Sequence, residues 1–166
     1  CGDNQVEMQC VCAMANIAEM VELHDRIVKE NGLSPIVALA KGDALGSKGE
    51  ACRALANLAA NSDMHDKLLK EDVLTPLVAA CKLDNVVSTR FGALGIANLA
   101  TSVQNQIKIM EAKGVDPLVK LIASPRKDIE ARRYATLAIA NMCSTHANHP
   151  AIVASGAYQA LFSLSN

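Results

Sequence analysis

Tryptophan is absent from this 166-residue sequence, and other aromatic residues are scarce, with only two Tyr and two Phe. The cores of β-sandwiches depend heavily on aromatic and β-branched residues, so this shortage argues against that class of fold. Just over half of the residues (51%) are nevertheless apolar, chiefly Ala, Leu, Val, Ile and Met. This composition favours helices that pack closely through small side chains.

The sequence also lacks a net charge of either sign, because 16 basic residues face 17 acidic ones. A general affinity for nucleic acids or for membrane surfaces is therefore not indicated. No apolar run approaches the roughly 20 residues that span a bilayer, and no signal peptide is recognisable. We expect a cytoplasmic protein, with the nucleus and the cytoskeleton as further locations. The first residue is Cys1 and not Met, so we expect a segment of a longer protein.

No C-x-x-C pair occurs among the six cysteines, most of which lie inside apolar runs. In such runs a free thiol behaves as a small hydrophobic group. We therefore predict a reducing compartment and no disulfide framework. The residues are Cys1, Cys10, Cys12, Cys52, Cys81 and Cys143.

A four-residue motif, Ala-Asn followed by two small or apolar residues, recurs along the chain. Its asparagines are Asn16, Asn57, Asn98 and Asn141, which are spaced by 41, 41 and 43 residues. Two further markers, a Pro-containing motif beginning at Ser34 and a His-Asp pair beginning at His24, keep the 41-residue step. A period shared by three markers predicts a tandem array of helical repeats.

Each repeat is expected to contain a short, a medium and a long helix. The short helices are predicted at 22–31, 63–72, 105–113 and 148–155, and the long ones at 6–19, 48–60, 87–101 and 128–144. Gly32, Gly114 and Gly156 follow three of the short helices, where a left-handed closing residue is expected. Val73 takes this place in the remaining copy and should strain or reshape the turn.

The medium helices are expected to begin where an oxygen-bearing side chain precedes a proline. Ser34, Thr75 and Asp116 would be the N-caps, each followed by Pro at the first helical position, where its missing N–H costs nothing. The last copy has Tyr158 and Gln159 there and loses this signal.

The predicted fold is all-α, a right-handed α-α superhelix in which each repeat buries its apolar faces against its neighbours. Three complete repeats, 21–61, 62–102 and 103–145, lie between a partial repeat at 1–20, which holds a long helix only, and another at 146–166. We expect both ends to expose apolar surface, which additional repeats of a longer protein would cover.

The pattern resembles the armadillo repeat family, which includes β-catenin and importin-α. The resemblance rests on two stretches. They match at Asn105, Ile109, Gly114, Pro117, Leu118, Val119, Leu121 and Ile122, and at Ala93, Leu94, Ala97, Asn98, Leu99 and Ala100. It covers essentially the whole chain. HEAT repeats are a structural alternative, although they usually lack the separate short helix and the Asn.

The resemblance implies that the long helices line a concave face and that Asn16, Asn57, Asn98 and Asn141 bind an extended peptide. A carboxamide both donates and accepts, as unpaired peptide groups require. Alternatively, these side chains bond to neighbouring helices and stiffen the array. Importin-α-like proteins carry Trp one turn earlier, whereas this sequence has Cys12, Arg53, Leu94 and Leu137. This difference argues against recognition of nuclear localisation signals.

Arg53, Arg90 and Arg133 would form a basic line along the groove, which would favour an acidic or phosphorylated ligand. Alternatively, they are surface charges paired with Glu50 and Glu130. Phe91 and Tyr134 are predicted either to anchor the ligand or to pack between repeats. Glu50, the three arginines and these two aromatic residues complete the predicted peptide-binding set.

A metal site at Cys143, His146 and His149 is rejected, because the repeat places His24, His65 and Gln106 in the slot of His149. No catalytic constellation can be assembled, so we expect neither enzymatic activity nor a cofactor. The predicted function is a protein-interaction scaffold for an extended segment of a partner protein, without contact to nucleic acid or membrane. A structural solenoid that docks laterally in a cytoskeletal or ciliary assembly is the alternative, and a nuclear cargo adaptor is a less favoured one.

Overall fold

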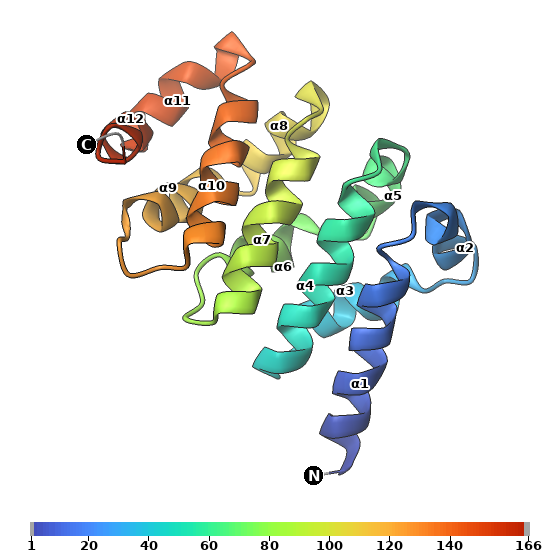
Figure 1. Ribbon diagram of the computed structural model, residues 1–166. Helices are drawn as coiled ribbons and strands as arrows, with labels where there is room; N and C mark the ends of the chain where they lie inside the picture. Colours follow the sequence, from blue (N-terminus) through green and yellow to red (C-terminus); the bar gives the residue numbers. More distant parts are fainter. Residues whose placement is uncertain (1, 165–166) are drawn as a thin grey trace.

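Helices are the regular elements in the described part of the chain, residues 2–164 of a computed structural model (Figure 1). The long helices are α1 (Gly2–Ile17), α4 (Leu45–Ala59), α7 (Val86–Leu99) and α10 (Ile129–Met142). The short ones are α2 (His24–Lys29), α5 (His65–Lys70), α8 (Val103–Glu111) and α11 (His149–Ala154). The medium ones are α3 (Leu33–Lys41), α6 (Leu74–Ala80), α9 (Val115–Ala123) and α12 (Ala157–Phe162). Single 3₁₀ turns precede α2, α5 and α11, at Val21–Leu23, Ser62–Met64 and His146–Asn148.

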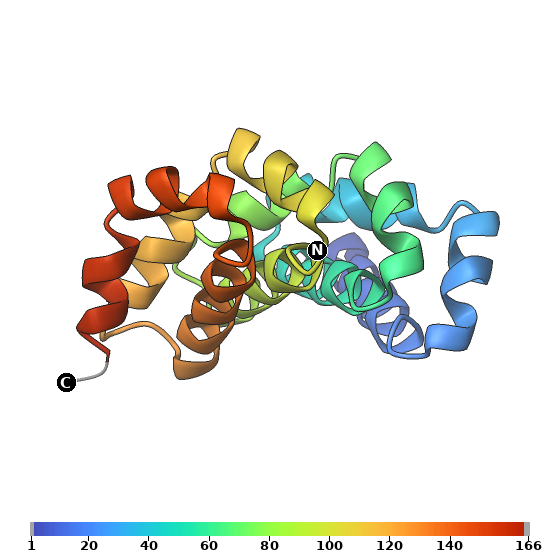
Figure 2. The same cartoon turned by 90° about the horizontal axis from the view of Figure 1, so that it is seen from above.

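The four long helices lie side by side in one layer, because α1 packs on α4, α4 on α7, and α7 on α10. Figure 2 shows that the array is curved and that this layer forms its inner side. The short and medium helices form the outer side. The predicted all-α superhelix is therefore confirmed. Between residues 2 and 164, no helix combines the length and the apolar character that a membrane span requires.

Small residues allow the close packing of long helices on medium helices. Ala51 and Ala54 of α4 are fully buried, and Gly92 and Gly95 take the same positions in α7. A methyl group added at Gly95 would lie 2.8 Å from a methyl carbon of Leu77 on α6. The scarcity of large aromatic residues thus corresponds to short distances between helices.

The turns that close the short helices differ from the prediction. The left-handed residues are Asn31, Asp72 and Lys113, with φ between 55° and 58°. Gly32 and Gly114 lie one residue later, with φ of −72° at both, so a left-handed conformation was wrongly predicted for them. For Gly156 the prediction is correct, since its φ is 81°.

Close approach, and not φ, explains the glycine that follows the left-handed residue. A Cβ at Gly114 would lie 2.9 Å from Cγ2 of Ile109 and 3.1 Å from its carbonyl oxygen. Val73 occupies the same slot, and Leu68, which has no branch at Cβ, stands there in the position of Ile109. The φ of Val73, −67°, is ordinary, although the bond from Val73 N to Leu68 O is lengthened to 3.3 Å.

The medium helices begin one residue before the predicted caps, at Leu33, Leu74 and Val115. Ser34, Thr75 and Asp116 are therefore second helical residues, and their assignment as N-caps was wrong. Each proline is the third helical residue. It is tolerated there because the first four N–H groups of a helix have no partner within the helix.

Candidate functional site

The asparagines of the repeated motif form a ladder across the inner layer. Nδ2 of Asn57 donates to the carbonyl oxygen of Ala15 at 3.2 Å. Asn98 bonds in the same way to Ala56, and Asn141 to Ala97, both at 3.0 Å. Each bond joins one long helix to the preceding long helix, as the stiffening alternative requires.

In the described chain, the oxygen side of the carboxamide is unbonded at three of the four asparagines. Within residues 2–164, the Oδ1 atoms of Asn57, Asn98 and Asn141 accept no hydrogen bond, and the three side chains are only partly buried. Asn16 differs, because it is exposed and its Oδ1 accepts from Nη2 of Arg53 at 2.8 Å. The three asparagines of α4, α7 and α10 are thus held in place with an acceptor unused.

The arginines predicted to form a basic line have acidic partners. Nε of Arg53 donates to Glu50 and its Nη1 to Glu19, both at 2.8 Å. Nη2 of Arg133 lies 2.8 Å from Glu130, and the guanidinium stands 5.0 Å from the ring centre of Tyr134. The pairs with Glu50 and Glu130 are those of the alternative interpretation, and Glu19 is an additional partner of Arg53.

Arg90 has a partner that sequence analysis missed. Its Nε and Nη2 donate to the two oxygens of Asp128 at 3.0 and 2.9 Å, a bidentate pair between α7 and the start of α10. The hydrogen bond from Arg90 holds the pKa of the Asp128 carboxyl below its ordinary value, and burial acts in the opposite direction. The predicted contact of Arg90 with a ligand would have to compete with this pair.

Apolar side chains lie beside the ladder at its C-terminal end. Leu137, one turn before Asn141, is exposed, and Leu94, one turn before Asn98, is partly buried. Phe91 and Tyr134 are partly buried and pack against the hydrophobic core. Most of the surface of the two aromatic side chains is buried, which favours packing over the role of ligand anchor.

A second polar ladder, not predicted from the sequence, runs beneath the C-terminal ends of the long helices. His65 bonds through Nε2 to Ala59 O at 2.8 Å, and its Nδ1 accepts from Nδ2 of Asn105 at 2.9 Å. Nδ2 of Asn148 similarly donates to Oε1 of Gln106 at 2.9 Å. The signal was a polar residue directly before the repeated His position, which is present at Asn105 and Asn148.

The first step of this second ladder is incomplete. Among the residues that the structure describes, Nδ1 of His24 is buried without a hydrogen-bond partner, because Met64 occupies the slot that Asn105 fills in the next repeat. His149 makes the same type of bond as the other members of this slot, to Cys143 O at 2.8 Å. In the described residues, no group of three His, Cys, Asp or Glu side chains is arranged to hold a metal ion.

No protein-family model matches the chain, and no curated protein matches it. Among solved structures, it is similar to a designed armadillo repeat protein in complex with the peptide (KR)4, with 28% identity, a TM-score of 0.89 and coverage of 98% of this chain. It is also similar to computationally designed armadillo repeat proteins for modular peptide recognition, with 27% identity, a TM-score of 0.88 and coverage of 94%. The chain spans 69% and 66% of the length of those two proteins.

Proposed function

The chain is an armadillo-like repeat solenoid, and from this fold we propose that it is a protein-interaction scaffold that holds an extended segment of a partner against its inner face. Designed proteins of the same fold include one in complex with a peptide and others made for modular peptide recognition. We propose a scaffold without enzymatic activity. We also propose that it acts in the cytoplasm.

The unused Oδ1 acceptors of Asn57, Asn98 and Asn141 are the observation that carries this proposal. An extended peptide has backbone N–H groups that need acceptors. Packed helices lie about 8–10 Å apart, and an extended chain advances about 3.3 Å per residue, so one asparagine would meet the peptide at every second or third residue. Because each Nδ2 is already bonded, the acceptors are held in position before the ligand arrives.

The chemistry of the inner face suggests a mixed ligand. Leu94 and Leu137 offer apolar contacts beside Asn98 and Asn141. Arg133 is exposed and lies on the same helix as Leu137. An apolar residue followed by an acidic or phosphorylated one would use both features. A Lys-rich segment would find no Trp side chains on the inner face, because other residues stand at the four positions where importin-α-like proteins carry Trp. Nuclear cargo transport is therefore not proposed.

Peptide selection followed by titration tests the proposal. Extended peptides would be selected on the wild-type chain and their binding measured by fluorescence anisotropy. We expect the double substitution Asn57→Ala and Asn98→Ala to weaken binding at least about tenfold, since each lost hydrogen bond is worth about 1 kcal/mol. Gln104→Ala, at an exposed position on the outer helix α8, is the matched control and should bind like the wild type.

Equal binding by the double variant and the wild type would contradict the proposal. If circular dichroism showed that the variant remained folded, the inner face would not be the site. Lateral docking through the outer helices, the structural alternative, would then be favoured.

A further inference from the structure

Arg53 is held on the inner face by three oxygen acceptors from two successive repeats. Its Nε donates to Glu50 of α4, its Nη1 to Glu19 and its Nη2 to Asn16 of α1, each at 2.8 Å. All three nitrogen atoms of the guanidinium are therefore bonded, and only 18% of the side chain is exposed. The side chain thus lies across the junction between α1 and α4, where it is fixed in one position.

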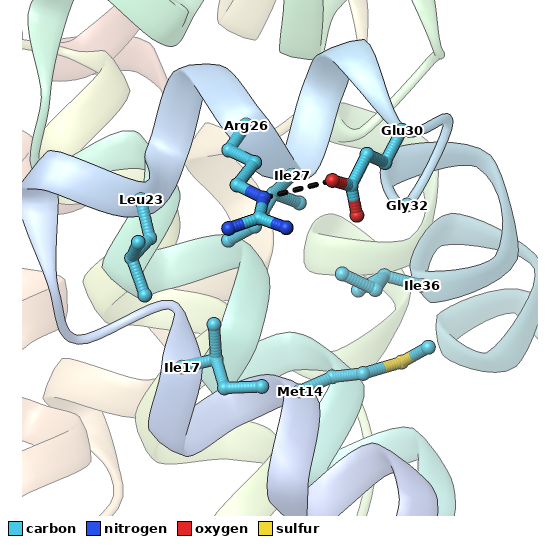
Figure 3. Close-up of a pocket in the computed structure, with 8 residues that line it drawn as sticks. All are labelled: Met14, Ile17, Leu23, Arg26, Ile27, Glu30, Gly32 and Ile36. Carbon is cyan, nitrogen blue, oxygen red and sulfur yellow. Dashed lines mark hydrogen bonds and ion pairs between the residues drawn. The ribbon is translucent and has the colours of Figure 1, made fainter.

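A second arginine shows what an ordinary ion pair of this chain is like. Arg26 of the outer helix α2 donates to Glu30, four residues later, at 2.8 Å, and its side chain is 74% exposed. Figure 3 shows this pair beside a cavity between α1, α2 and α3. Exposed pairs of this kind contribute little to stability. The acceptors of Arg53, in contrast, come from two long helices and enclose the guanidinium.

The acceptors around Arg53 form a site for a guanidinium group. Such a group only donates hydrogen bonds, and here two carboxylates and one amide oxygen converge on it. One positive charge faces two negative charges, so the site disfavours an acidic side chain. Leu94 and Leu137 stand at the equivalent positions of the next two repeats. The stacking of the long helices therefore does not require an arginine at this position.

The bond from Arg53 to Asn16 also ends the row of free acceptors on the inner face. Within residues 2–164, Oδ1 of Asn57 accepts no hydrogen bond, as at Asn98 and Asn141, whereas Oδ1 of Asn16 is taken. A peptide that continued past Asn57 toward α1 would find the acceptor used and the side-chain site filled. Because Arg53 is part of the chain, it competes with a ligand side chain at a high effective concentration.

We propose that Arg53 is a specificity-determining residue, which fills a guanidinium subsite from within the chain and so ends the peptide site at Asn57. A partner segment then lies across α4, α7 and α10 and gains nothing by extending over α1. A basic residue in the extension is excluded because Arg53 holds its place, and an acidic one because Glu19 and Glu50 repel it. This inference rests on the proposed peptide-binding function.

Peptides of two lengths test the inference. A peptide of about seven residues reaches the three asparagines of α4, α7 and α10, so one such peptide, selected on the wild-type chain, is the short probe. The long probes add Ala-Arg-Ala or Ala-Glu-Ala to one end or to the other, which covers both directions of the ligand. Fluorescence anisotropy gives the Kd of each probe for each variant.

Arg53→Leu, which copies the residue of the next two repeats, should open the subsite. For this variant the better of the two Ala-Arg-Ala probes should bind at least about fivefold more tightly than the short probe, the effect of one gained hydrogen bond. The Ala-Glu-Ala probes should gain less. For the wild type, no addition should tighten binding. Arg26→Leu removes an arginine from the outer side and should behave like the wild type.

The outcomes separate this inference from the proposed function. An equal gain from Ala-Arg-Ala in the wild type and in Arg53→Leu would overturn the inference alone. A short probe that binds without dependence on Asn57 and Asn98 would overturn the proposed function, and the inference with it.

NMR of the wild type gives a second measurement that needs no binding by a variant. The Nε–H signal of Arg53 would be assigned by its absence from the spectrum of Arg53→Lys. It should keep its chemical shift when a long probe binds, because the bond to Glu50 remains. A change of this signal on binding would show that the ligand displaces Arg53, and would overturn the inference.

Discussion

Arg90 of α7 and Asp128, the residue directly before α10, form two parallel hydrogen bonds of 3.0 and 2.9 Å. Oδ2 of the same carboxylate accepts from the backbone N–H of Ala131 at 3.0 Å and so caps α10. One side chain therefore joins two repeats and begins a helix.

Replacing Asp128 by Ala should remove both functions. We expect the free energy of unfolding, measured by urea denaturation at neutral pH, to fall by about 0.5–2 kcal/mol, the usual range for a lost N-cap. Asp84→Ala is the control, since Asp84 pairs with Lys127 but is fully exposed. A loss as large at Asp84 as at Asp128 would show that the cap and the bidentate geometry contribute nothing.

The same carboxylate predicts a dependence on pH. Its pKa is lowered in the folded chain, first by the hydrogen bond from Arg90. A lowered pKa stabilises the fold above the unfolded value of about 3.9 and loses this effect as the pH falls through the folded value. The stability difference between the wild type and Asp128→Asn should therefore be full near neutrality and shrink in acid. A difference that is constant with pH would contradict this account.

The contact between Gly114 and Ile109 predicts a coupled pair of substitutions. Gly114→Val should destabilise the chain by about 1–3 kcal/mol, as overpacking does, because its side chain would meet Cγ2 of Ile109. In an Ile109→Leu background, which copies the Leu68 and Val73 pair, the cost should be smaller. A double-mutant cycle by denaturation measures the coupling. If Gly114→Val lowered the free energy of unfolding equally in both backgrounds, the contact with the carbonyl oxygen of Ile109 alone would explain why position 114 requires glycine.

The buried bond between Asn105 and His65 predicts a loss specific to the second polar ladder. Asn105→Met should leave Nδ1 of His65 without a partner, as Met64 leaves His24. The expected cost is about 1–3 kcal/mol, because a buried polar atom is then unsatisfied. Gln104→Met, at the exposed neighbouring position, should change the unfolding midpoint little. Equal midpoints for the two variants would argue against the bond.

Thiol reactivity should separate the cysteines. Burial raises the pKa of Cys52 to about 12 and also raises that of Cys81, so little thiolate forms at either residue in mild alkali. A disulfide reagent should modify exposed Cys10 in the native chain and reach Cys52 and Cys81 only after unfolding. Cys52→Ala should lower the number of thiols modified in urea by one and leave the number modified in the native chain unchanged.

The long helices were predictable because the Ala-Asn motif and the apolar periodicity lie within single repeats. Asn57, Asn98 and Asn141 were accordingly placed on one layer. The turns were not predictable, because Gly114 is required by a contact with Ile109 and not by its own φ. The partner of Arg90 was missed because Asp128 is 38 residues away. It also lies between Asn98 and Asn141, where the spacing of the motif is 43 residues and not 41.

Most hydrogen bonds between neighbouring repeats, including those of Asn57, Asn98 and Asn141, lie toward the C-terminal ends of the long helices. The opposite ends are joined by fewer polar contacts, such as that of Arg90 with Asp128. When the array bends, the N-terminal ends of the long helices should therefore move apart or together more than their C-terminal ends, which the asparagine bonds hold. The spacing of the Oδ1 acceptors would then stay nearly constant while the distant rim of the layer widens or narrows.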